Sequence, residues 1–362
     1  MDQNFFLQLV GGFGLLILGA ELLVRGASKL AYTIGISPLV VGLTFVALGS
    51  STPELAVAFQ SSLSGSGDIG VGNIIGSNII NVLFILGITA IILPVAIKQQ
   101  LVRLDVPIMI AVSVLLFIFS LDGRLGRVDG FILFSGLIVY TLFAIRQSRS
   151  ESKYVKDEYA QEFGNEECRN LPQALLQVIF IITGFCLLAF GSDWLVEGAR
   201  SLALALGLSE LIIGLTVVAL GTGMPEVVTS ITASIRGEQD IAVGNIIGSN
   251  IYNILAVLGI VSLITPEGVI VPPSILAFDL PIMITVAVAC LPIFFLNYRI
   301  ARWEGALFFG YYLAYTLYLI LEATEHDALS TFSFVMAAFM LPLTFVTIAV
   351  LEFQYLRSQK PT

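Results

Sequence analysis

Two glutamates inside long apolar runs are the residues of this chain whose placement most strongly suggests chemistry. Glu54 follows Pro53, and Glu226 follows Pro225 in the same way. A carboxylate surrounded by hydrocarbon costs several kcal/mol unless a partner compensates its charge. Because the chain accepts this cost twice, we interpret both carboxylates as members of an ion site.

The two glutamates belong to a duplicated stretch. Residues 42–94 and 214–266 align without a gap at a constant offset of 172, and 29 of the 53 positions are identical. In each copy the Pro-Glu pair is followed by the sequence Gly-Asn-Ile-Ile-Gly-Ser-Asn. The duplication predicts two copies of one structural unit that present the same side chains.

The prolines predict interrupted helices. Proline inside a helix removes a backbone hydrogen bond and releases carbonyl oxygens about one turn earlier, here near Gly49 and Gly221. Released carbonyls survive at membrane depth only within protein or around a polar cavity. Residues three, four or seven apart share one helix face. The candidate ligands on that face are Ala47, Ser50, Ser51 and Glu54 in the first copy and Ala219, Thr222 and Glu226 in the second.

The next apolar segment of each copy carries a polar side chain at every fourth residue. These residues are Asn73, Ser77 and Asn81 in the first copy and Asn245, Ser249 and Asn253 in the second. Glycines at positions 72, 76, 244 and 248 allow helices to approach closely, as small residues do in membrane bundles. If the two copies face each other, all these oxygens converge.

A cage built only from oxygen atoms favours hard cations. Calcium takes six to eight oxygen ligands, and two carboxylates match its charge. The motifs contain no His or Cys, which disfavours zinc or copper. Sodium ions or protons could compensate the same two charges. A site whose charge must always be compensated suits exchange, because release of one cation favours the loading of another.

The composition places the chain in a bilayer. Hydrophobic residues make up 57% of it, charged residues 12%, and the mean hydropathy is +0.95, whereas soluble domains are about a quarter charged. The alternation of a barrel strand is missing, so we expect an all-α membrane protein. The three scattered cysteines have no metal or disulfide spacing, and no cofactor is expected. Eleven predicted spanning helices cover residues 5–24, 38–62, 69–93, 102–121, 128–145, 174–196, 209–234, 241–265, 275–296, 304–322 and 329–353.

The duplication extends over five predicted helices on each side. Leu104-Asp-Val-Pro-Ile-Met-Ile110, for example, matches Phe278-Asp-Leu-Pro-Ile-Met-Ile284. Five is an odd number, so the second unit enters the membrane from the opposite face and the halves form an inverted repeat, an arrangement typical of secondary transporters with a site at the midplane. The predicted parts are the first repeat (1–145), a linker (146–173), the second repeat (174–323) and an extra helix with a tail (324–362).

The distribution of basic residues predicts the orientation. With the N-terminus outside and the C-terminus in the cytoplasm, 14 of the 17 Lys and Arg residues fall in cytoplasmic loops or the tail, as the positive-inside rule requires. The segment 146–173 is then a solvated cytoplasmic linker. We expect a multi-pass protein of the plasma (inner) membrane, and the sequence leaves its oligomeric state open.

At these motifs the chain resembles the cation/calcium exchanger superfamily, and more closely its prokaryotic sodium/calcium exchanger-like branch. The resemblance rests on the family's Gly-[Thr/Ser]-Ser-x-Pro-Glu motif, which reads Gly-Ser-Ser-Thr-Pro-Glu at 49–54 and Gly-Thr-Gly-Met-Pro-Glu at 221–226, and on the duplicated Gly-Asn-x-x-Gly-Ser-Asn motif. It implies a ten-helix core that exchanges Ca²⁺ for Na⁺ by alternating access. The ligands that it implies are Glu54, Asn81, Glu226 and Asn253, with Ala47, Ser50, Ser51, Ser77, Ala219, Thr222 and Ser249 nearby.

Two positions depart from the family pattern. Gly223 stands where the second repeat often has Ser, and Asn253 stands where some sodium/calcium exchangers have Asp. One hydroxyl and one charge are therefore absent, which bears on the counter-ion and the stoichiometry. A cation/proton antiporter with the same fold is the near alternative.

Other interpretations use the same residues. Both glutamates could be protonated packing residues, and Asn73, Asn78, Asn245 and Asn250 could join helices only through hydrogen bonds. Gly65-Ser-Gly-Asp68 spells the motif of intramembrane aspartyl proteases, but no Tyr-Asp partner motif exists in the chain, so we do not expect an enzyme. A passive channel is a further alternative.

Several other acidic residues invite structural explanations. Glu21 and Arg25 are four residues apart and suggest an ion pair near a helix end. Asp68 and Asp240 precede apolar segments and suggest helix N-caps. The aspartates before Pro107 and Pro281 suggest helix starts in the same way.

Overall fold

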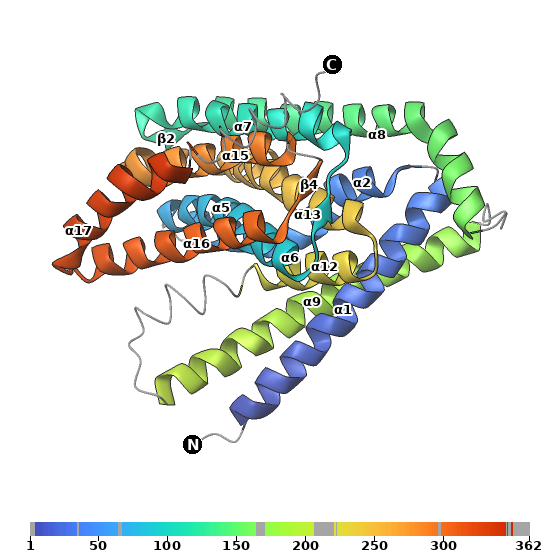
Figure 1. Cartoon of the computed structure of the whole chain (residues 1–362), viewed down its shortest axis with the longest axis horizontal. Coiled ribbons are helices and arrows are strands. Elements are labelled where there is room, and N and C mark those ends of the chain that lie inside the picture. Colours follow the sequence, from blue (N-terminus) through green and yellow to red (C-terminus); the bar gives the residue numbers. More distant parts are fainter. Residues whose placement is uncertain are drawn as a thin grey trace, which may run out of the picture.

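The computed structural model describes residues 4–34, 36–63, 67–163, 171–205, 221, 223–295 and 298–344, with residues 346 and 349. These residues form a helical bundle with two short strand ribbons. Figure 1 shows the helices of the two halves interleaved.

The first half begins with one long helix and continues with interrupted ones. Its elements are α1 (Asn4–Ile34), α2 (Pro38–Val41), η1 (Gly42–Val46), α3 (Ala47–Ser50), α4 (Thr52–Leu63), α5 (Gly67–Ile80), η2 (Asn81–Leu86), α6 (Gly87–Ile92), β1 (Val95–Ala96), η3 (Leu101–Asp105), α7 (Val106–Phe119), η4 (Ser120–Asp122), β2 (Arg124–Leu125) and α8 (Arg127–Phe163). Helix α8 therefore continues into the predicted linker.

The second half follows the same order. Its described elements are α9 (Leu171–Ala205), α12 (Met224–Ile235), α13 (Gln239–Tyr252), η6 (Asn253–Leu258), α14 (Gly259–Ile264), β3 (Val269–Ile270), η7 (Ile275–Asp279), α15 (Leu280–Phe295), β4 (Arg299–Ile300) and α16 (Arg302–Ala323), followed by α17 (Ala328–Val335) and η8 (Met336–Met340). Elements η2 and η6, and likewise η3 and η7, are π-helical segments at equivalent places in the two copies.

Eight helices of the described part are long and apolar enough to cross a membrane. The predicted span 38–62 is a ninth if it is counted as one, although it bends by 41° between Pro38–Ser50 and Thr52–Ser62. This is the break that Pro53 predicts. Half of the predicted span 209–234 lies outside the described residues, and of the predicted span 329–353 only a shorter apolar helix over Ala328–Thr344 is found in the described part.

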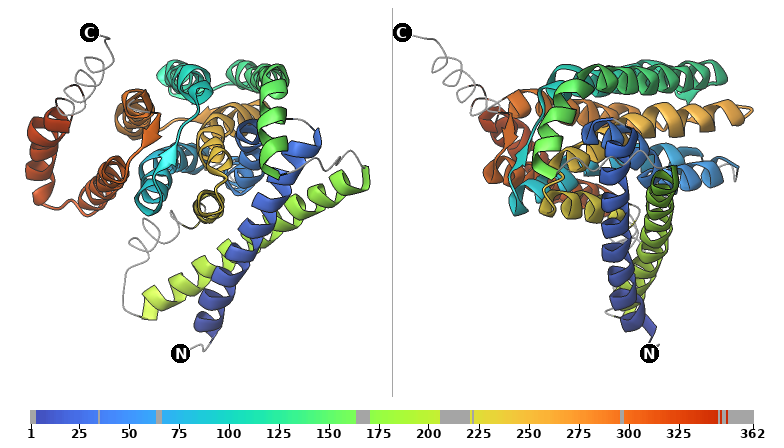
Figure 2. Two further views of the ribbon diagram at one scale, coloured as in Figure 1. Left: turned by 45° about the vertical axis from the view of Figure 1, so that its right-hand side comes forward. Right: turned by 90° about the vertical axis from the view of Figure 1, so that its right-hand side faces the viewer.

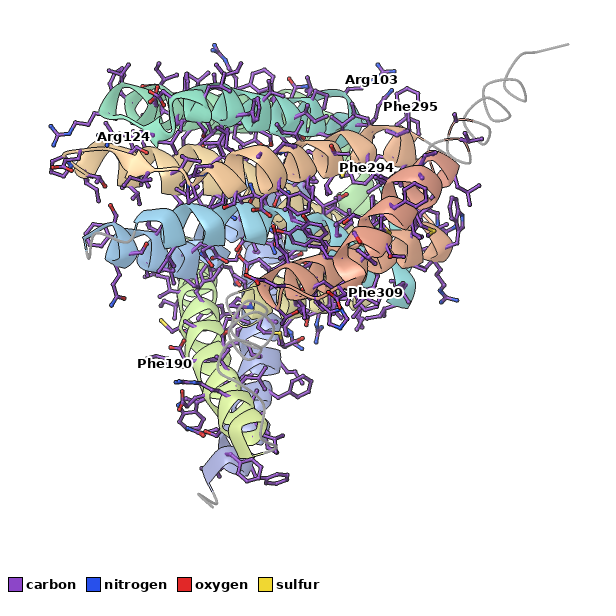
Figure 3. All side chains as sticks on the ribbon, turned by 90° about the vertical axis from the view of Figure 1, so that its left-hand side faces the viewer. Arg103, Arg124, Phe190, Phe294, Phe295 and Phe309 are labelled. Carbon is purple, nitrogen blue, oxygen red and sulfur yellow. The ribbon has the colours of Figure 1, made fainter. Side chains whose placement is uncertain are left out.

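The two ribbons lie at opposite ends of the bundle, and each joins one loop from each half. Val95 pairs with Ile300 in β1–β4, and Leu125 pairs with Val269 in β2–β3. Figure 3 places Arg103, close to β1, and Arg124, in β2, at opposite ends of the helices. This exchange of equivalent partners is the contact pattern of an inverted repeat.

Helices α1 and α9 pack along each other and slope away from the other helices (Figures 1 and 2). A Cβ atom on Gly12 would lie 2.8 Å from the Gly191 carbonyl oxygen, and one on Gly19 would lie 2.9 Å from the Gly184 carbonyl oxygen. Gly184 and Gly191 are the repeat equivalents of Gly12 and Gly19. The contact between α1 and α9 is therefore symmetric, and the two helix backbones approach too closely for larger residues at these glycine positions.

The polar residues at the end that holds β1 connect loops that the sequence places on one side. Glu21 forms the predicted ion pair with Arg25 and also pairs with Arg236, beyond α12. Lys98 pairs with Asp240 at 2.6 Å. Loops 25–37, 94–103 and 235–240, which were predicted to share the cytoplasmic side, thus gather at one end of the molecule.

Three of the predicted helix caps are wrong. Asp240 lies inside the first turn of α13, where it pairs with Lys98 and not with the helix terminus. Asp105 makes no cap hydrogen bond and accepts one from Tyr140 at 3.2 Å, and its counterpart Asp279 accepts one from Tyr315 at 2.8 Å. The side chain of Asp68 lies outside the described residues. The partners of these carboxylates are tyrosine hydroxyls of the neighbouring helices α8 and α16 and the Lys98 ammonium of a loop.

Candidate functional site

The two glutamates lie in the first turn of equivalent helices, just after each copy's interruption. Glu54 is the third residue of α4 and Glu226 is the third residue of α12, and their exposures are 1% and 2%. They lie close enough that a negative charge on one would act on the other. The structure therefore brings the two predicted carboxylates together in the interior.

Hydroxyl groups of both halves lie near these carboxylates. The Ser50 hydroxyl donates to Asn245 Oδ1 at 3.0 Å, lies 3.2 Å from the Ser249 hydroxyl, and is a neighbour of Glu226. Ser77 makes a long contact of 3.5 Å to Glu54 Oε1. Residue 50 comes from the first copy and residues 245, 249 and 226 from the second, so the copies share one polar interior.

The asparagines of α5 and α13 meet across the pseudo-two-fold axis of the repeat. Asn81 Nδ2 donates to Asn250 Oδ1 at 2.9 Å, and Asn253 Nδ2 donates to Asn78 Oδ1 at 2.9 Å. The backbone carbonyls take part too: Asn78 Nδ2 donates to the Asn250 carbonyl at 3.2 Å, and Asn250 Nδ2 donates to the Asn78 carbonyl at 3.3 Å. Every bond of this network therefore has a symmetric counterpart.

Several oxygen atoms at this place are buried without a hydrogen-bond partner. They are Glu54 Oε2, Glu226 Oε2, Asn253 Oδ1 and the Ser51 hydroxyl. Buried polar atoms are normally paired, and a set of carboxylate, amide and hydroxyl oxygens suits a hard cation such as Ca²⁺. The described residues contain no group of three or more His, Cys, Asp or Glu side chains that could hold a metal, so amides and hydroxyls would complete any such shell.

The predicted site residues of the first copy are all described and all buried. Ala47, Ser50, Ser51, Glu54, Ser77 and Asn81 are at most 6% exposed. The Ala47 carbonyl is not released as the sequence predicted, because it accepts hydrogen bonds from the Ser51 amide at 3.0 Å and from the Ser50 hydroxyl at 3.3 Å. The interruption falls at Ser51, two residues after Gly49, near which the release was predicted.

In the second copy Glu226, Ser249 and Asn253 are described and buried, while Ala219 and Thr222 lie outside the described residues. The predicted close approach holds at Gly244, where a Cβ atom would lie 2.7 Å from the Leu39 carbonyl oxygen. Helix α13 therefore packs directly against the interrupted helix of the other half.

The sequence did not predict the π-helical segments. Asn81 begins η2 and Asn253 begins η6, and π-bulges are frequent at functional sites. Sequence reasoning also left Asn78 and Asn250 among possible packing residues, although their repetition in both copies was a usable signal. The Asn245 side chain bonds two serines: its Oδ1 accepts from the Ser50 hydroxyl, and its Nδ2 donates to the Ser230 hydroxyl at 3.2 Å.

Comparison with known families decides the class of this protein. Residues 4–146 and 176–321 match the family described as sodium/calcium exchanger protein. The chain belongs to this family. The match covers both duplicated halves, and it supports cation exchange involving Ca²⁺ as the general activity.

Individual proteins similar to this chain agree with this assignment. The inner membrane protein YrbG of Escherichia coli is 38% identical over 283 residues, covering 77% of this chain and 85% of that protein. The sodium/calcium exchanger MaX1 of Methanosarcina acetivorans is 31% identical, covering 87% of this chain and 98% of that protein. The solved sodium/calcium exchanger from Methanococcus jannaschii superposes with a TM-score of 0.73 at 26% identity, covering 86% of this chain and 97% of that one.

Proposed function

We propose that this chain exchanges Ca²⁺ for Na⁺ by alternating access at one shared site near the middle of the membrane. The observation that carries the proposal is the meeting of Glu54 and Glu226, two buried carboxylates from inverted copies, with unpartnered oxygens around them. Two such charges in a low-dielectric interior require a cation whenever they are ionised.

The proposed ligands divide by chemistry. Glu54 and Glu226 supply the charge, and Asn81 and Asn253 supply neutral amide oxygens. The remaining proposed ligands of Ca²⁺ or Na⁺ are the carbonyls of Ala47 and Ala219 and the hydroxyls of Ser50, Ser51, Ser77, Thr222 and Ser249. The Ala47 carbonyl accepts two hydrogen bonds, so binding a cation there would replace the longer one, from the Ser50 hydroxyl.

Charge explains why such a site would exchange its ions. One Ca²⁺ neutralises both carboxylates, and two Na⁺ ions do so equally well, whereas a site without ions leaves two buried charges that repel each other. Crossing between the two access states is therefore favoured only when the site is loaded. This requirement couples the release of one cation to the uptake of the other.

The proposed architecture is a core of ten helices, 1–145 and 174–323, joined by the 146–173 linker and followed by one further helix. The N-terminus lies outside and the C-terminus in the cytoplasm of a cell whose plasma membrane holds the protein. The gathering of loops 25–37, 94–103 and 235–240 at one end supports this arrangement.

Calcium uptake into sodium-loaded proteoliposomes tests the proposal. Wild-type protein should take up Ca²⁺ when Na⁺ is diluted outside, whereas Glu54→Gln and Glu226→Gln should reduce uptake to the level of protein-free liposomes, because each removes half of the site's charge. Glu322→Gln, at an exposed position at the end of α16, is the matched control and should transport normally.

Three results would contradict the proposal in different ways. Full transport by Glu54→Gln would remove the site assignment. Uptake that follows a pH gradient and ignores Na⁺ would identify a proton antiporter with the same fold. Uncoupled Ca²⁺ current would identify a channel.

A further inference from the structure

Asn78 and Asn250 are buried polar side chains at the repeat interface, and no role in cation binding has yet been assigned to them. They are 2% and 3% exposed. The network around them fixes the orientation of each amide. Asn78 Nδ2 faces the Asn250 carbonyl oxygen and Asn250 Nδ2 faces the Asn78 carbonyl oxygen, at 3.2 and 3.3 Å. A carbonyl oxygen only accepts hydrogen bonds, so reversing either amide would place two acceptors against each other.

The second hydrogen of each amide nitrogen also has an acceptor. Asn78 Nδ2 lies 3.6 Å from Met283 Sδ, and Asn250 Nδ2 lies 3.5 Å from Met109 Sδ. Met109 and Met283 occupy matching places in the duplicated Leu-Asp-Val-Pro-Ile-Met-Ile and Phe-Asp-Leu-Pro-Ile-Met-Ile segments. With both donors engaged, each Oδ1 atom has one available direction, which is toward the other repeat's ligand asparagine.

The fixed Oδ1 atoms in turn orient two of the proposed ligands. Asn250 Oδ1 accepts from Asn81 Nδ2, and Asn78 Oδ1 accepts from Asn253 Nδ2, both at 2.9 Å. An amide whose nitrogen is held in this way presents its oxygen on the opposite side. In Asn253 this oxygen is buried and has no hydrogen-bond partner.

The same contacts specify the chemistry of the ligand. A carboxylate at position 81 or 253 would set a second acceptor against Asn250 or Asn78 Oδ1, where the network needs a donor. Neutral amides satisfy it, and they leave the charge of the site to Glu54 and Glu226 alone.

We propose that Asn78 and Asn250 are positioning residues that act across the repeat interface, Asn78 on Asn253 and Asn250 on Asn81, to aim those amide oxygens into the cation site. This inference rests on the proposed function, since it takes Asn81 and Asn253 as cation ligands. The specific claim is that each positioning residue orients the ligand of the other repeat, and not the ligand three positions away on its own helix.

Double-mutant cycles, read out as the half-saturating Ca²⁺ concentration for transport, test whether each positioning residue acts on the ligand of the other repeat. Asn78→Ala should raise the half-saturating Ca²⁺ concentration about ten- to hundredfold, the usual cost of losing a partner that orients a metal ligand. Once Asn253→Ala has removed the ligand, adding Asn78→Ala should change the half-saturating concentration by less than about twofold. The pair Asn250 and Asn81 should behave in the same way.

Pairs on one helix provide the contrast. Asn78→Ala and Asn81→Ala should have effects that multiply, because they act on different ligands. Thr89→Val removes another buried hydroxyl of the same segment, which bonds only the Ile85 carbonyl at 2.6 Å, and should leave calcium affinity unchanged. If Asn78→Ala fails to give monodisperse protein, the Asn250 cycle tests the same relation from the other side.

The outcomes separate the positioning role from the function on which it rests. Multiplicative effects for the crossed pairs, or a loss of thermal stability with unchanged half-saturating Ca²⁺, would overturn the positioning role and leave the site standing. Unchanged affinity in Asn81→Ala and Asn253→Ala themselves would overturn both the ligand assignment and the positioning role.

Discussion

At the scale of single residues, this protein is dominated by two carboxylates that it cannot leave uncompensated. Glu54 and Glu226 are almost completely buried, and a negative charge on one would act on the other. No Lys or Arg side chain forms a salt bridge with either of them among the described residues. A structural ion pair among the described residues therefore does not neutralise them, which leaves the proposed mobile cation or bound protons as the compensation.

The sequence was sufficient to predict which charged residues meet, but not how the neutral ones orient. Glu54 and Glu226 stood out because a charge in an apolar run is costly and was repeated. Asn78 lies off the spacing of Asn73, Ser77 and Asn81 and was grouped with Asn73 among residues that could only join helices, although the structure gives Asn78 a partner in the other half. Hydrogen-bond direction depends on the exact meeting of two helices from distant parts of the chain, which periodicity does not encode.

At the scale of elements, interruption and close approach position the site. The break near Pro53 bends one predicted span by 41° and places Glu54 in the first turn of α4. The sequence predicted this break, because Pro53 lies inside an apolar run. The π-helical segments η2 and η6 carry no such signature, because a single wide turn leaves composition and hydrophobic pattern unchanged.

The symmetric contact between α1 and α9 leads to a prediction with a control on the same helix. Gly19→Ala should lower the thermal midpoint and calcium uptake, because its Cβ atom would lie 2.9 Å from both the Gly184 carbonyl oxygen and the Leu188 amide nitrogen, and overpacking costs about 1–3 kcal/mol. Gly14→Ala has no atom within 4 Å of the new Cβ and should match wild type in both measurements. Equal behaviour of the two variants would show that α1 and α9 do not pack as described.

At the scale of the whole molecule, the sequence predicts five spans in each copy, and an odd number of spans turns a duplication into an inversion. The crossed ribbons, in which β1 pairs with β4 and β2 pairs with β3, are the clearest structural sign of it. The sequence predicted the inversion from the number of apolar runs in each copy. The number of spans was harder to predict, since the described part contains eight long apolar helices, or nine with the bent pair, against eleven apolar runs.

The predicted orientation can be measured at the two ribbons. In a variant lacking Cys168, Cys186 and Cys290, Arg299→Cys should react with a membrane-impermeant thiol reagent only from the cytoplasmic side, and Arg124→Cys only from outside. Both side chains are exposed. Reaction of both positions from one side would contradict the inverted arrangement, and reversed sides would contradict the positive-inside prediction.

The central claim is that carboxylates from the two inverted copies hold one cation between them, and anomalous diffraction from crystals soaked in Ca²⁺ tests it most directly. The account predicts a peak about 2.3–2.6 Å from a carboxylate oxygen of both Glu54 and Glu226, with the Asn253 side-chain oxygen facing it. A peak bound by only one of the two glutamates, or a calcium site elsewhere in the protein, would contradict the account.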